Sequence, residues 1–426
     1  MKTLVLSVWI FINLILFGMF GYILLIWSQH WHAVSHKHQI EVLPEESFER
    51  PLVEYFNDDF KRFMDNIERP RLEKRSKPPL MMFPKETPVE PAASSFNDTL
   101  NRVKAHKNSI MLRLRRVLYS ESDVQKFQAS NPYNVNYTGL YGTQQGGMSK
   151  ESLLCSLKQR LPFIKTLRKE DVPFRENLSK SLFEDHILGS GKRYQKCAIV
   201  SNAGSLINSK SGYFIDNHDL VLRFNHAPTD GYVEDVGMKT DIRIVNSKVA
   251  SNPKFEFLSS PRFRNVTILV WDPCSYSSSL KEWLASPEHP FLEPFMKHRK
   301  LYPKNKSYIL DPRQLWTLYD YLQAHTPVRL RPNPPSSGLL GLALLLPHCN
   351  VVNMIEFVPS VRLTQRCHYF EPLMDEHCTF GVWHPLAAEK FLMINMNSAS
   401  DIKTYQNGYV SIQGSATSSM KKTYLP

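Results

Sequence analysis

The sequence predicts an α/β fold, in which one domain with a mostly parallel sheet flanked by helices follows a membrane anchor and a stem. Short apolar runs rich in β-branched and aromatic residues recur after Cys155, and turn residues bound them. Helix-length segments, such as 314–323 and 338–346, separate several of these runs, and this alternation is typical of parallel sheets. The predicted strands are residues 197–201, 220–225, 241–246, 266–272, 307–311 and 351–358.

An uncharged N-terminal run predicts the anchor. Residues 3–27 contain no charged side chain, and Leu, Ile, Val, Phe and Trp dominate them. A membrane-spanning helix needs about 20 apolar residues, whereas the apolar core of a cleaved signal peptide is usually about 7–15 residues long. We therefore expect a cytoplasmic tail at residues 1–3 and a transmembrane signal-anchor at residues 4–27.

A stem is expected next. Residues 28–105 are crowded with charges and interrupted by prolines, so they should be extended or partly disordered. Apolar and basic residues then alternate over residues 107–120. This pattern favours an amphipathic helix that packs on the domain over a helix that binds a membrane surface. The folded lumenal domain is expected at residues 106–426.

Charge and missing motifs narrow the function. The 426 residues carry a formal net charge of +12, which suits anionic partners such as nucleic acid, lipid or a charged small substrate. Neither the dinucleotide fingerprint GxGxxG nor the P-loop GxxxxGK[ST] occurs. The Asp-x-Asp pair that many nucleotide-sugar transferases use to hold a divalent metal is also missing. A transferase with this sequence would therefore have to neutralise its leaving group with helix ends, hydroxyls and imidazoles.

Cysteines and glycosylation sequons place the body of the protein in an oxidising compartment. The six cysteines show no CxxC spacing, which favours a few structural disulfides over a zinc site, and we expect no metal. Several Asn-X-Ser/Thr sequons spread through the body indicate a lumenal domain. These sequons are at Asn97, Asn136, Asn177, Asn265 and Asn305.

Polar residues follow four of the predicted strands. Asn202 comes after the first strand, Asn225 and Asn246 end the next two, and Asp272 ends the fourth. Ligands of parallel sheets bind beyond the carboxyl ends of the strands, so this rim would suit sugar hydroxyls and a ribose. Asn and Asp also favour ordinary turns, and both interpretations remain open on the residues alone.

The segment "NPPSSGLLGLALLLPHC" combines a polar start with an apolar helix. Pro334 and Pro335 disfavour helix before them, and Ser336 or Ser337 can cap the helix that follows. Gly338 would let a ligand approach the backbone, and the free N–H groups would face an anion. An ordinary capped core helix would suit the apolar run equally well.

A stretch rich in histidines and aromatics follows. Residues 367–390 contain His368, His377 and His384, and this spacing does not favour zinc. Histidines in proteins are more often structural than catalytic. His384, however, precedes a proline and should sit on a constrained loop, where it could serve as a general base at neutral pH.

At these residues the chain resembles the animal-type sialyltransferases, over roughly residues 197–390. "CAIVSNAGSLINSKSGYFIDNHDLVLRFNHAPTDGYVEDVGMKTDIRIVNS" resembles the large motif of that family, and "PNPPSSGLLGLALLLPHCNVVNMIEF" its small motif. "HYFE" and "HPLAAEK" resemble the third and very small motifs. "LRFNHAPTDGYVEDVG" with "PNPPSSG" is most similar to the β-galactoside α2,6-sialyltransferase branch.

The resemblance implies a GT-A-like (Rossmann-like) fold and a single-pass type II protein of the Golgi membrane. It implies an inverting, metal-independent transfer of sialic acid from CMP-sialic acid to the 6-OH of terminal galactose or N-acetylgalactosamine on glycoprotein glycans. No cofactor and no nucleic-acid partner is expected. His384 matches the catalytic base of the family. The matching donor-site positions are Asn202, Asn225, Asn246, Ser336, Ser337, Gly338, Cys367, His368, Thr379, Trp383 and Lys390.

The resemblance also implies two disulfides, Cys197–Cys349 and Cys367–Cys378. The chain departs from the family pattern at two points. Asn202 stands where the vertebrate members have serine, and the tail "SSMKKTYLP" lacks a terminal cysteine. We therefore expect Cys155 to pair with Cys274. Two rival functions remain open, a lumenal glycosyl- or sulfotransferase of another donor class and a non-catalytic, lectin-like Golgi protein.

Overall fold

The predicted sheet is present, and it contains one strand more than the sequence indicated. The computed structural model describes residues 96–121, 133–141, 148–161, 164–168, 171, 187–188, 191–375, 377–381 and 383–414. All of these belong to one compact unit. The predicted tail and anchor, the first part of the predicted stem and the Asn177 sequon lie outside the described residues.

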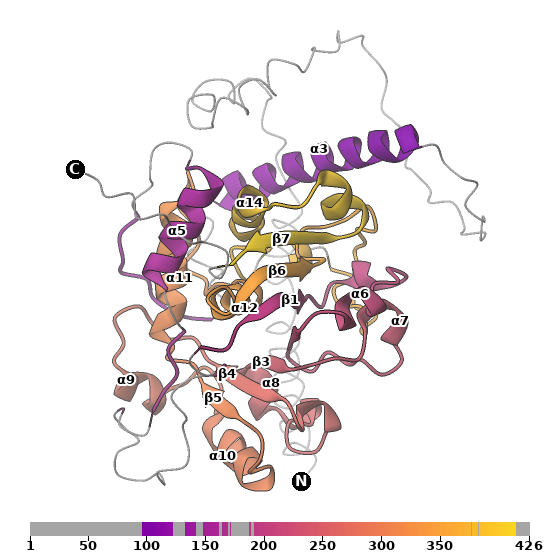
Figure 1. Ribbon diagram of the computed structural model, residues 1–426. Coiled ribbons are helices and arrows are strands. Elements are labelled where there is room, and N and C mark those ends of the chain that lie inside the picture. Colours follow the sequence, from indigo (N-terminus) through magenta and orange to yellow (C-terminus); the bar gives the residue numbers. More distant parts are fainter. Residues whose placement is uncertain are drawn as a thin grey trace, which may run out of the picture. The chain divides into compact units, whose positions relative to one another are not determined.

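Seven strands form a single sheet in the order β5-β4-β3-β2-β1-β6-β7 (Figure 1). Neighbouring strands run parallel except β6 and β7, which are antiparallel. The six predicted strands are confirmed within a few residues at each end, and β7 was not predicted. The strands are β1 Tyr194–Val200, β2 Leu220–Phe224, β3 Ile242–Asn246, β4 Thr267–Trp271, β5 Ser307–Ile309, β6 Cys349–Ile355 and β7 Tyr409–Gln413.

Helices flank the sheet, as the alternation of the sequence predicted (Figure 1). The predicted helices at residues 314–323 and 338–346 are confirmed as α11 and α12. The helices are α3 Phe96–Glu121, α5 Lys150–Arg160, α6 Gly212–Asp216, α7 Val233–Val236, α8 Ser247–Ser251, α9 Leu280–Ala285, α10 Leu292–Leu301, α11 Arg313–Ala324, α12 Ser337–Leu345, α13 His377–Phe380 and α14 Leu386–Met396.

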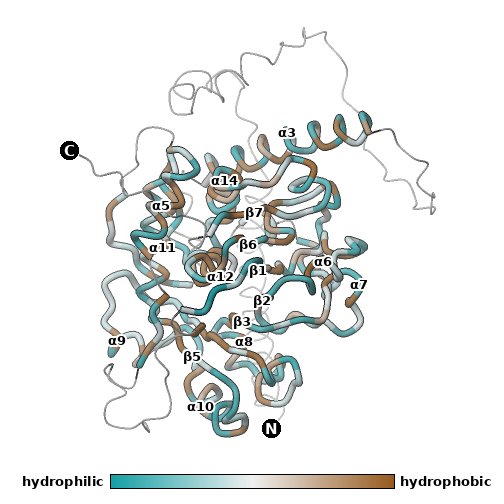
Figure 2. Tube along the Cα trace, in the orientation of Figure 1, coloured by the Kyte–Doolittle hydropathy of each residue, from teal (hydrophilic) through white to brown (hydrophobic). Residues whose placement is uncertain are grey.

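Alternating side chains of the strands supply two hydrophobic cores. In β1, Cys197 and Ile199 face the larger core, whereas Ala198 and Val200 face the smaller one. This alternation follows from the two-residue period of a strand. The larger core also takes in α12, which is hydrophobic along its whole length (Figure 2). Because α12 is buried on all sides, its position relative to the sheet is fixed.

Helix α3 extends further towards the N-terminus than the sequence indicated. The predicted amphipathic helix at residues 107–120 is confirmed, but α3 begins at Phe96, inside the predicted stem. Val103, Ile110, Leu114 and Leu118 are buried along one side of α3, which packs on α14. The expectation of an extended stem is therefore wrong for residues 96–105, because an apolar stripe at helical spacing continues into them.

Two of the three expected disulfides are present. Cys197 of β1 is bonded to Cys349 of β6, and Cys367 is bonded to Cys378. The expected bond between Cys155 and Cys274 is wrong, because both thiols are free. Cys155 lies on α5, whereas Cys274 is buried beyond β4, where the Trp316 indole donates a hydrogen bond to its carbonyl oxygen.

The sheet order marks where a ligand should bind. From β1 the chain adds β2 to β5 on one side, and then returns to place β6 on the other side of β1. In open parallel sheets the crevice at such a reversal, beyond the carboxyl ends of the strands, is the usual ligand site. The loops that follow β1 and β6 are therefore the first place to look for a functional site.

The sequence predicts a membrane-spanning helix and glycosylated asparagines. No helix in the described part of the chain has the length and apolarity needed to cross a membrane. The Asn97, Asn136 and Asn265 side chains are exposed. Asn305 is half-buried, because its Nδ2 donates to the carbonyl of Phe263 at 2.8 Å and its Oδ1 accepts from the backbone N–H of Asn265 at 2.9 Å.

Candidate active site

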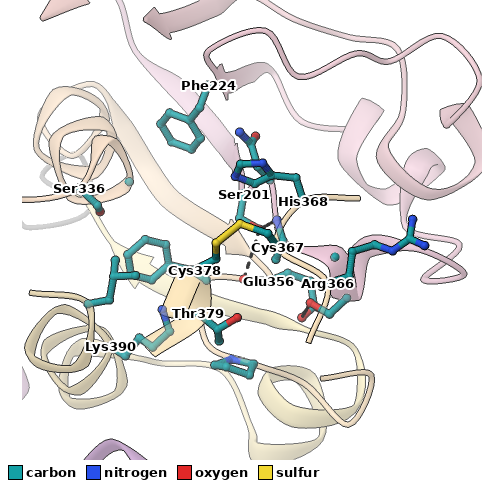
Figure 3. A pocket seen from close by; sticks show the side chains of 18 of the residues that line it. Ser201, Phe224, Ser336, Glu356, Arg366, Cys367, His368, Cys378, Thr379 and Lys390 are labelled. Atoms are coloured by element: carbon teal, nitrogen blue, oxygen red, sulfur yellow. Dashed lines mark hydrogen bonds between the residues drawn. A yellow bond between two sulfur atoms is a disulfide. The ribbon is translucent and has the colours of Figure 1, made fainter. Parts of the chain in front are cut away.

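A pocket of about 190 Å³ lies at the carboxyl ends of β1, β2 and β6 (Figure 3). Its walls are residues 201–205 after β1, Phe224 and Asn225 at the end of β2, and the first turn of α12. Segments from the loop after β6 and from residues 378–390 complete it. Figure 3 shows the Cys367–Cys378 disulfide between the side chains of His368 and Lys390. The pocket thus occupies the crevice that the sheet order indicates.

Most of the residues expected at the site do line this pocket. Asn246 and Trp383 do not, because Asn246 caps α8 and Trp383 is 49% exposed outside it. The expected residues that line it are Asn202, Asn225, Ser336, Ser337, Gly338, Cys367, His368, Thr379, His384 and Lys390.

Asn225 is held in a conformation that few residues adopt. Its φ is 49°, in the left-handed region that asparagine tolerates better than most other residues. Its Oδ1 accepts the backbone N–H of Asn246 at 3.0 Å, and the Asn246 side chain in turn caps α8 through the N–H of Val249. The two amides therefore form a chain across the ends of β2 and β3, and Asn246 supports the site from behind it.

Asn202 carries an acceptor without a partner. Its Oδ1 is buried and has no hydrogen-bond partner among the described residues. The backbone around it is fixed, because the N–H of Tyr369 donates to its carbonyl at 3.0 Å. A buried polar atom left unpaired costs free energy, so this oxygen is suited to accept a donor from a ligand in the pocket.

The start of α12 is built by a buried carboxylate. The Ser336 hydroxyl caps α12 by accepting the N–H of Leu339 at 3.3 Å, and it also donates to Glu389 of α14. Glu389 accepts the backbone N–H of Ser336 as well, at 2.7 Å. The Ser336 side chain is thus already occupied. Gly338 is required by packing, because a Cβ there would lie 2.2 Å from the Phe357 ring.

Trp271, the last residue of β4, contacts both the start of α12 and His384. Its indole N–H donates to the Ser337 hydroxyl at 2.9 Å. Its ring lies 6.3 Å, centroid to centroid, from the ring of His384. Since Trp271 is buried and α12 is fixed in the core, the Trp271 indole and the Ser337 hydroxyl are both held in place.

His384 has one ring nitrogen that can only accept, and it accepts a hydrogen bond from the Tyr133 hydroxyl. Its Nδ1 lies 2.7 Å from the carbonyl oxygen of Pro334, which can only accept, so Nδ1 carries the proton. Nε2 therefore bears the lone pair, and the Tyr133 hydroxyl lies 3.3 Å from it. Burial lowers the pKa of His384 to about 4, so the ring is neutral at physiological pH. The arrangement provides a neutral base with a defined tautomer.

The pocket wall carries positive charge. Lys390 is only 5% exposed, and its Nζ lies 5.1 Å from the centroid of the Phe357 ring. Burial lowers the pKa of Lys390 and raises that of its neighbour Glu389. Arg366 also lines the pocket. Together with the N-terminus of α12, these groups favour an anionic ligand.

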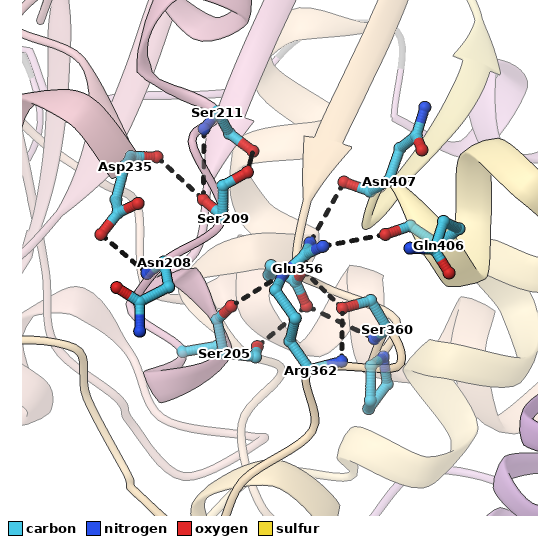
Figure 4. A network of polar contacts seen from close by, with 12 residues as sticks. Ser205, Asn208, Ser209, Ser211, Asp235, Glu356, Ser360, Arg362, Gln406 and Asn407 are labelled. Carbon is cyan, nitrogen blue, oxygen red and sulfur yellow. Dashed lines mark hydrogen bonds and ion pairs between the residues drawn. The ribbon is translucent and has the colours of Figure 1, made fainter. Parts of the chain in front are cut away.

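Glu356 and Arg362 form an ion pair that connects two loops of the pocket (Figure 4). Glu356 directly follows β6, and its side chain is fully buried. It accepts hydrogen bonds from the hydroxyls of Ser205 and Ser360, both at 2.8 Å, and pairs with Arg362. Burial raises the pKa of Glu356, and the Arg362 guanidinium opposes that shift. The network joins the loops that follow β1 and β6.

The end of β4 carries a second buried carboxylate. Asp272 is fully buried, and its Oδ2 accepts from the Trp283 indole at 2.8 Å and from the backbone N–H of Glu288 at 3.1 Å. Its Oδ1 makes no hydrogen bond of normal geometry within the described residues. Burial raises the pKa of Asp272, which the Ser247 hydroxyl and the Trp283 indole oppose. Burial and the Asp272 charge raise the pKa of Glu288 to about 7.

Several of these residues carried little sequence signal. Glu389 and Lys390 are the two charges of the largely apolar helix α14, and Glu356 is a charge at the end of an apolar strand. Both patterns could have marked buried carboxylates. Trp271 and Tyr133 gave no signal, since their role depends on contacts between distant segments. Within the described residues, no group of three or more His, Cys, Asp or Glu side chains could hold a metal ion.

Comparison with known proteins identifies relatives of this chain. Residues 145–400 match the family model described as glycosyltransferase family 29 (sialyltransferase). A beta-galactoside alpha-2,6-sialyltransferase 2 of Bos taurus is 39% identical over 287 residues, which are 67% of this chain and 57% of that protein. The Homo sapiens protein of the same name is 37% identical over 295 residues, 68% of this chain and 55% of that protein. The chain thus spans little more than half the length of these relatives.

A solved structure described as a mammalian sialyltransferase was also matched. It is 22% identical, with a TM-score of 0.32, and the match covers 59% of this chain and 78% of that one.

Proposed function

The chain belongs to glycosyltransferase family 29, the sialyltransferases, and from that premise we propose that it transfers sialic acid from CMP-sialic acid to a sugar hydroxyl. The observation that carries the proposal is the pocket itself. Five separate segments line one cavity, and they bring to it a neutral histidine, a buried lysine and the start of a helix. This set of groups supplies a base and a counter-charge for an anionic leaving group.

His384 acts as the general base in this proposal. The acceptor hydroxyl replaces the Tyr133 hydroxyl at Nε2, whose lone pair accepts its proton while the oxygen attacks the anomeric carbon of sialic acid. The bond from that carbon to the phosphate oxygen breaks, and CMP leaves from the opposite face, so the configuration is inverted. The Nδ1–H bond to Pro334 fixes the tautomer throughout the reaction, which is the role of an orienting partner.

The departing phosphate gains negative charge in the transition state. Lys390 and the first turn of α12 lie in the same pocket and are held there before the ligand arrives. Donors fixed in advance are worth about 3 kcal/mol each in other enzymes. The unpaired Oδ1 of Asn202 is suited to a hydroxyl or amino group of the donor.

The acceptor is proposed to approach along the end of β4. Trp271 places this strand end beside His384, and the buried Asp272 follows it directly. Tyr133 and the exposed Trp383 lie on the same side, with their ring centroids 6.3 Å apart. Carboxylate oxygens and aromatic rings are groups that bind sugars. We propose that the acceptor is the 6-OH of a terminal galactose or N-acetylgalactosamine, in keeping with the names of the relatives.

The finer features of the proposal extend beyond the pocket. We propose a GT-A-like variant of the parallel fold, a single-pass type II anchor at residues 4–27 and residence in the Golgi membrane. The reaction is proposed to need no metal, since the sequence lacks Asp-x-Asp. Glycosylation is proposed at the exposed Asn136 and Asn265 before the half-buried Asn305.

The test is a transfer assay. The purified protein is incubated with CMP-sialic acid and a panel of galactosides, and the linkage of the product is determined by mass spectrometry. An α2,6-linked product with release of CMP supports the proposal. Glycan binding without CMP release would favour a lectin-like protein, and activity only with another activated donor would favour a different transferase.

A further inference from the structure

A second histidine shares a carboxylate with the pocket histidine His368. Glu371 lies between His226, which follows Asn225 at the end of β2, and His368. Its Oε2 is 2.7 Å from Nδ1 of His368, and its Oε1 is 3.3 Å from Nε2 of His226. His226 does not line the pocket, whereas His368 does (Figure 3). Glu371 is therefore the polar group through which His226 can act on the pocket.

Aromatic rings restrict how the imidazoles of His226 and His368 can turn. The Phe370 ring is stacked on His368, with the centroids 5.2 Å apart and the planes 10° from parallel. The same Phe370 ring meets the edge of His226 at 5.1 Å, and Phe255 packs on His226 at 4.6 Å. Neither imidazole can therefore turn without displacing a ring.

His226 supplies a hydrogen bond without adding a charge. Its Nδ1 is buried and has no partner among the described residues, so a proton there would be an unpaired buried donor. Burial lowers the pKa of His226, Glu371 opposes the shift, and Arg262, which binds the His226 carbonyl at 3.0 Å, adds to it. The neutral ring with its proton on Nε2 is thus the favoured form, and it donates to Glu371.

The consequence for His368 is a fixed orientation. The bond from Nδ1–H to Glu371 leaves Nε2 as the ring nitrogen that can reach a ligand. Partial burial acts to raise the pKa of Glu371, but the hydrogen bond and charge of His368 lower it, so the carboxylate stays ionised. An ionised Glu371 with one oxygen held by His226 has only one position from which to hold His368.

We propose that His226 is a positioning residue of the donor site, which orients His368 by anchoring Glu371. The inference rests on the proposed function, since it assumes that the pocket binds an anionic nucleotide-sugar donor. With both ring nitrogens protonated, His368 donates from Nδ1 to Glu371 and from Nε2 to a phosphate or carboxylate of the donor.

The test is the steady-state kinetics of His226→Ala and His226→Gln with CMP-sialic acid as the varied substrate. His226→Ala should raise the KM for the donor about threefold to tenfold, the range of one ordinary hydrogen bond, and change kcat and the acceptor KM less than twofold. His226→Gln should restore the wild-type KM, because the amide nitrogen of glutamine can replace Nε2 as a neutral donor.

The matched control is His325→Ala. His325 is also half-buried and also has one ring nitrogen without a partner among the described residues. Its Nδ1 lies 2.7 Å from the backbone carbonyl oxygen of Tyr321, and it does not line the pocket. A donor KM that rises equally in His226→Ala and His325→Ala would overturn the proposal, because both would then act through general destabilisation.

A double-mutant cycle separates the relay from a direct contact. If His226 acts only through Glu371, adding His226→Ala to Glu371→Ala should not raise the donor KM further. An additive rise would overturn the proposal. A wild-type protein that neither binds CMP nor transfers sialic acid would instead defeat the proposed function, so the two failures can be told apart.

Discussion

Two strands of the sheet end in buried carboxylates that are built in opposite ways. At the end of β6, Glu356 accepts hydrogen bonds from two serine hydroxyls and pairs with Arg362 (Figure 4). At the end of β4, Asp272 has one oxygen occupied and one that makes no hydrogen bond of normal geometry within the described residues.

The two carboxylates therefore suit different roles: Glu356 supports the pocket, and Asp272 lies on the proposed acceptor side. A carboxylate whose oxygens are engaged by the protein is held in place, and its removal leaves the part-buried Arg362 without its counter-charge. A buried carboxylate with an unfilled oxygen costs stability unless something fills it. The β6 end therefore braces the pocket, and the proposed acceptor side is the β4 end, where Trp271 lies beside His384.

The largest effect is expected on the β4 side. His384→Ala removes the proposed base and should lower kcat about 100-fold to 10,000-fold, while CMP still binds with a similar Kd. Transfer assays and calorimetry measure the two quantities. His377→Ala, an exposed histidine paired with Asp375, is the control and should remain active. Near-normal turnover of His384→Ala would exclude it as the base.

Glu356→Ala should chiefly affect folding. Removing Glu356 leaves Arg362 without its carboxylate and the Ser205 and Ser360 hydroxyls without their acceptor, so the free energy of unfolding should fall by about 3–5 kcal/mol. Urea denaturation measures this change, and Glu256→Ala provides a control, because Glu256 is an exposed residue. A loss below about 1 kcal/mol would mean that the β6 end is not a brace.

Asp272→Asn should show the reverse pattern. The amide can keep the bonds to Trp283 and to the Glu288 N–H, so the free energy of unfolding should change by less than about 1 kcal/mol. It puts an amide nitrogen in place of Oδ1 and removes the charge, so the acceptor KM should rise about tenfold, with the donor KM unchanged. An unchanged acceptor KM would remove Asp272 from the acceptor side.

The pH profile should reflect the buried state of His384. Because burial lowers its pKa from 6.5 to about 4, the proton-accepting form is present well below pH 6. The acidic limb of kcat/KM due to His384 should therefore lie near pH 4 and not near 6.5. The sign for stability is the opposite of that for a paired cation: the unfolded chain protonates first, so this contribution to stability is lost as pH falls from about 6.5 to 4. An acidic limb near pH 6.5 that disappears in His384→Ala would contradict the first expectation.

The smallest effect is expected from metal removal. If the leaving phosphate is neutralised by Lys390 and the start of α12, EDTA should not change kcat or the donor KM. Activity that is lost in EDTA and restored by a divalent cation would show that a metal ion supplies the counter-charge, and not Lys390 with the start of α12.

The sequence predicted those parts of the fold that depend on neighbouring residues. Six strands appeared as runs of β-branched and aromatic residues, and α12 as an apolar helix with a serine cap. Strand β7 was missed because "YVSIQ" buries only alternate residues at a sheet edge, which gives a short and weak pattern. The start of α3 was missed because the prolines before it dominated the composition of the predicted stem.

The site was predictable where motifs list its residues, and not where distant segments meet. The sequence indicated that Asn225 and Asn246 belong together, but not that one supports the other from behind the pocket. It placed Ser336 at a helix start, but the occupation of its hydroxyl by Glu389 depends on how α14 packs. The Cys155–Cys274 pairing was inferred by elimination, and the structure has both thiols free.

The Cys197–Cys349 disulfide encloses 152 residues of sequence separation, including the four strands β2 to β5. A protease that cuts once in the exposed turn between residues 230 and 231 would leave two fragments joined through β1 and β6. Residues 201–225 of the pocket would lie on one fragment, and those from 336 to 390 on the other. Nicked protein should migrate as one band without reductant and as two bands with it, and only the reductant should be able to separate the two halves of the pocket.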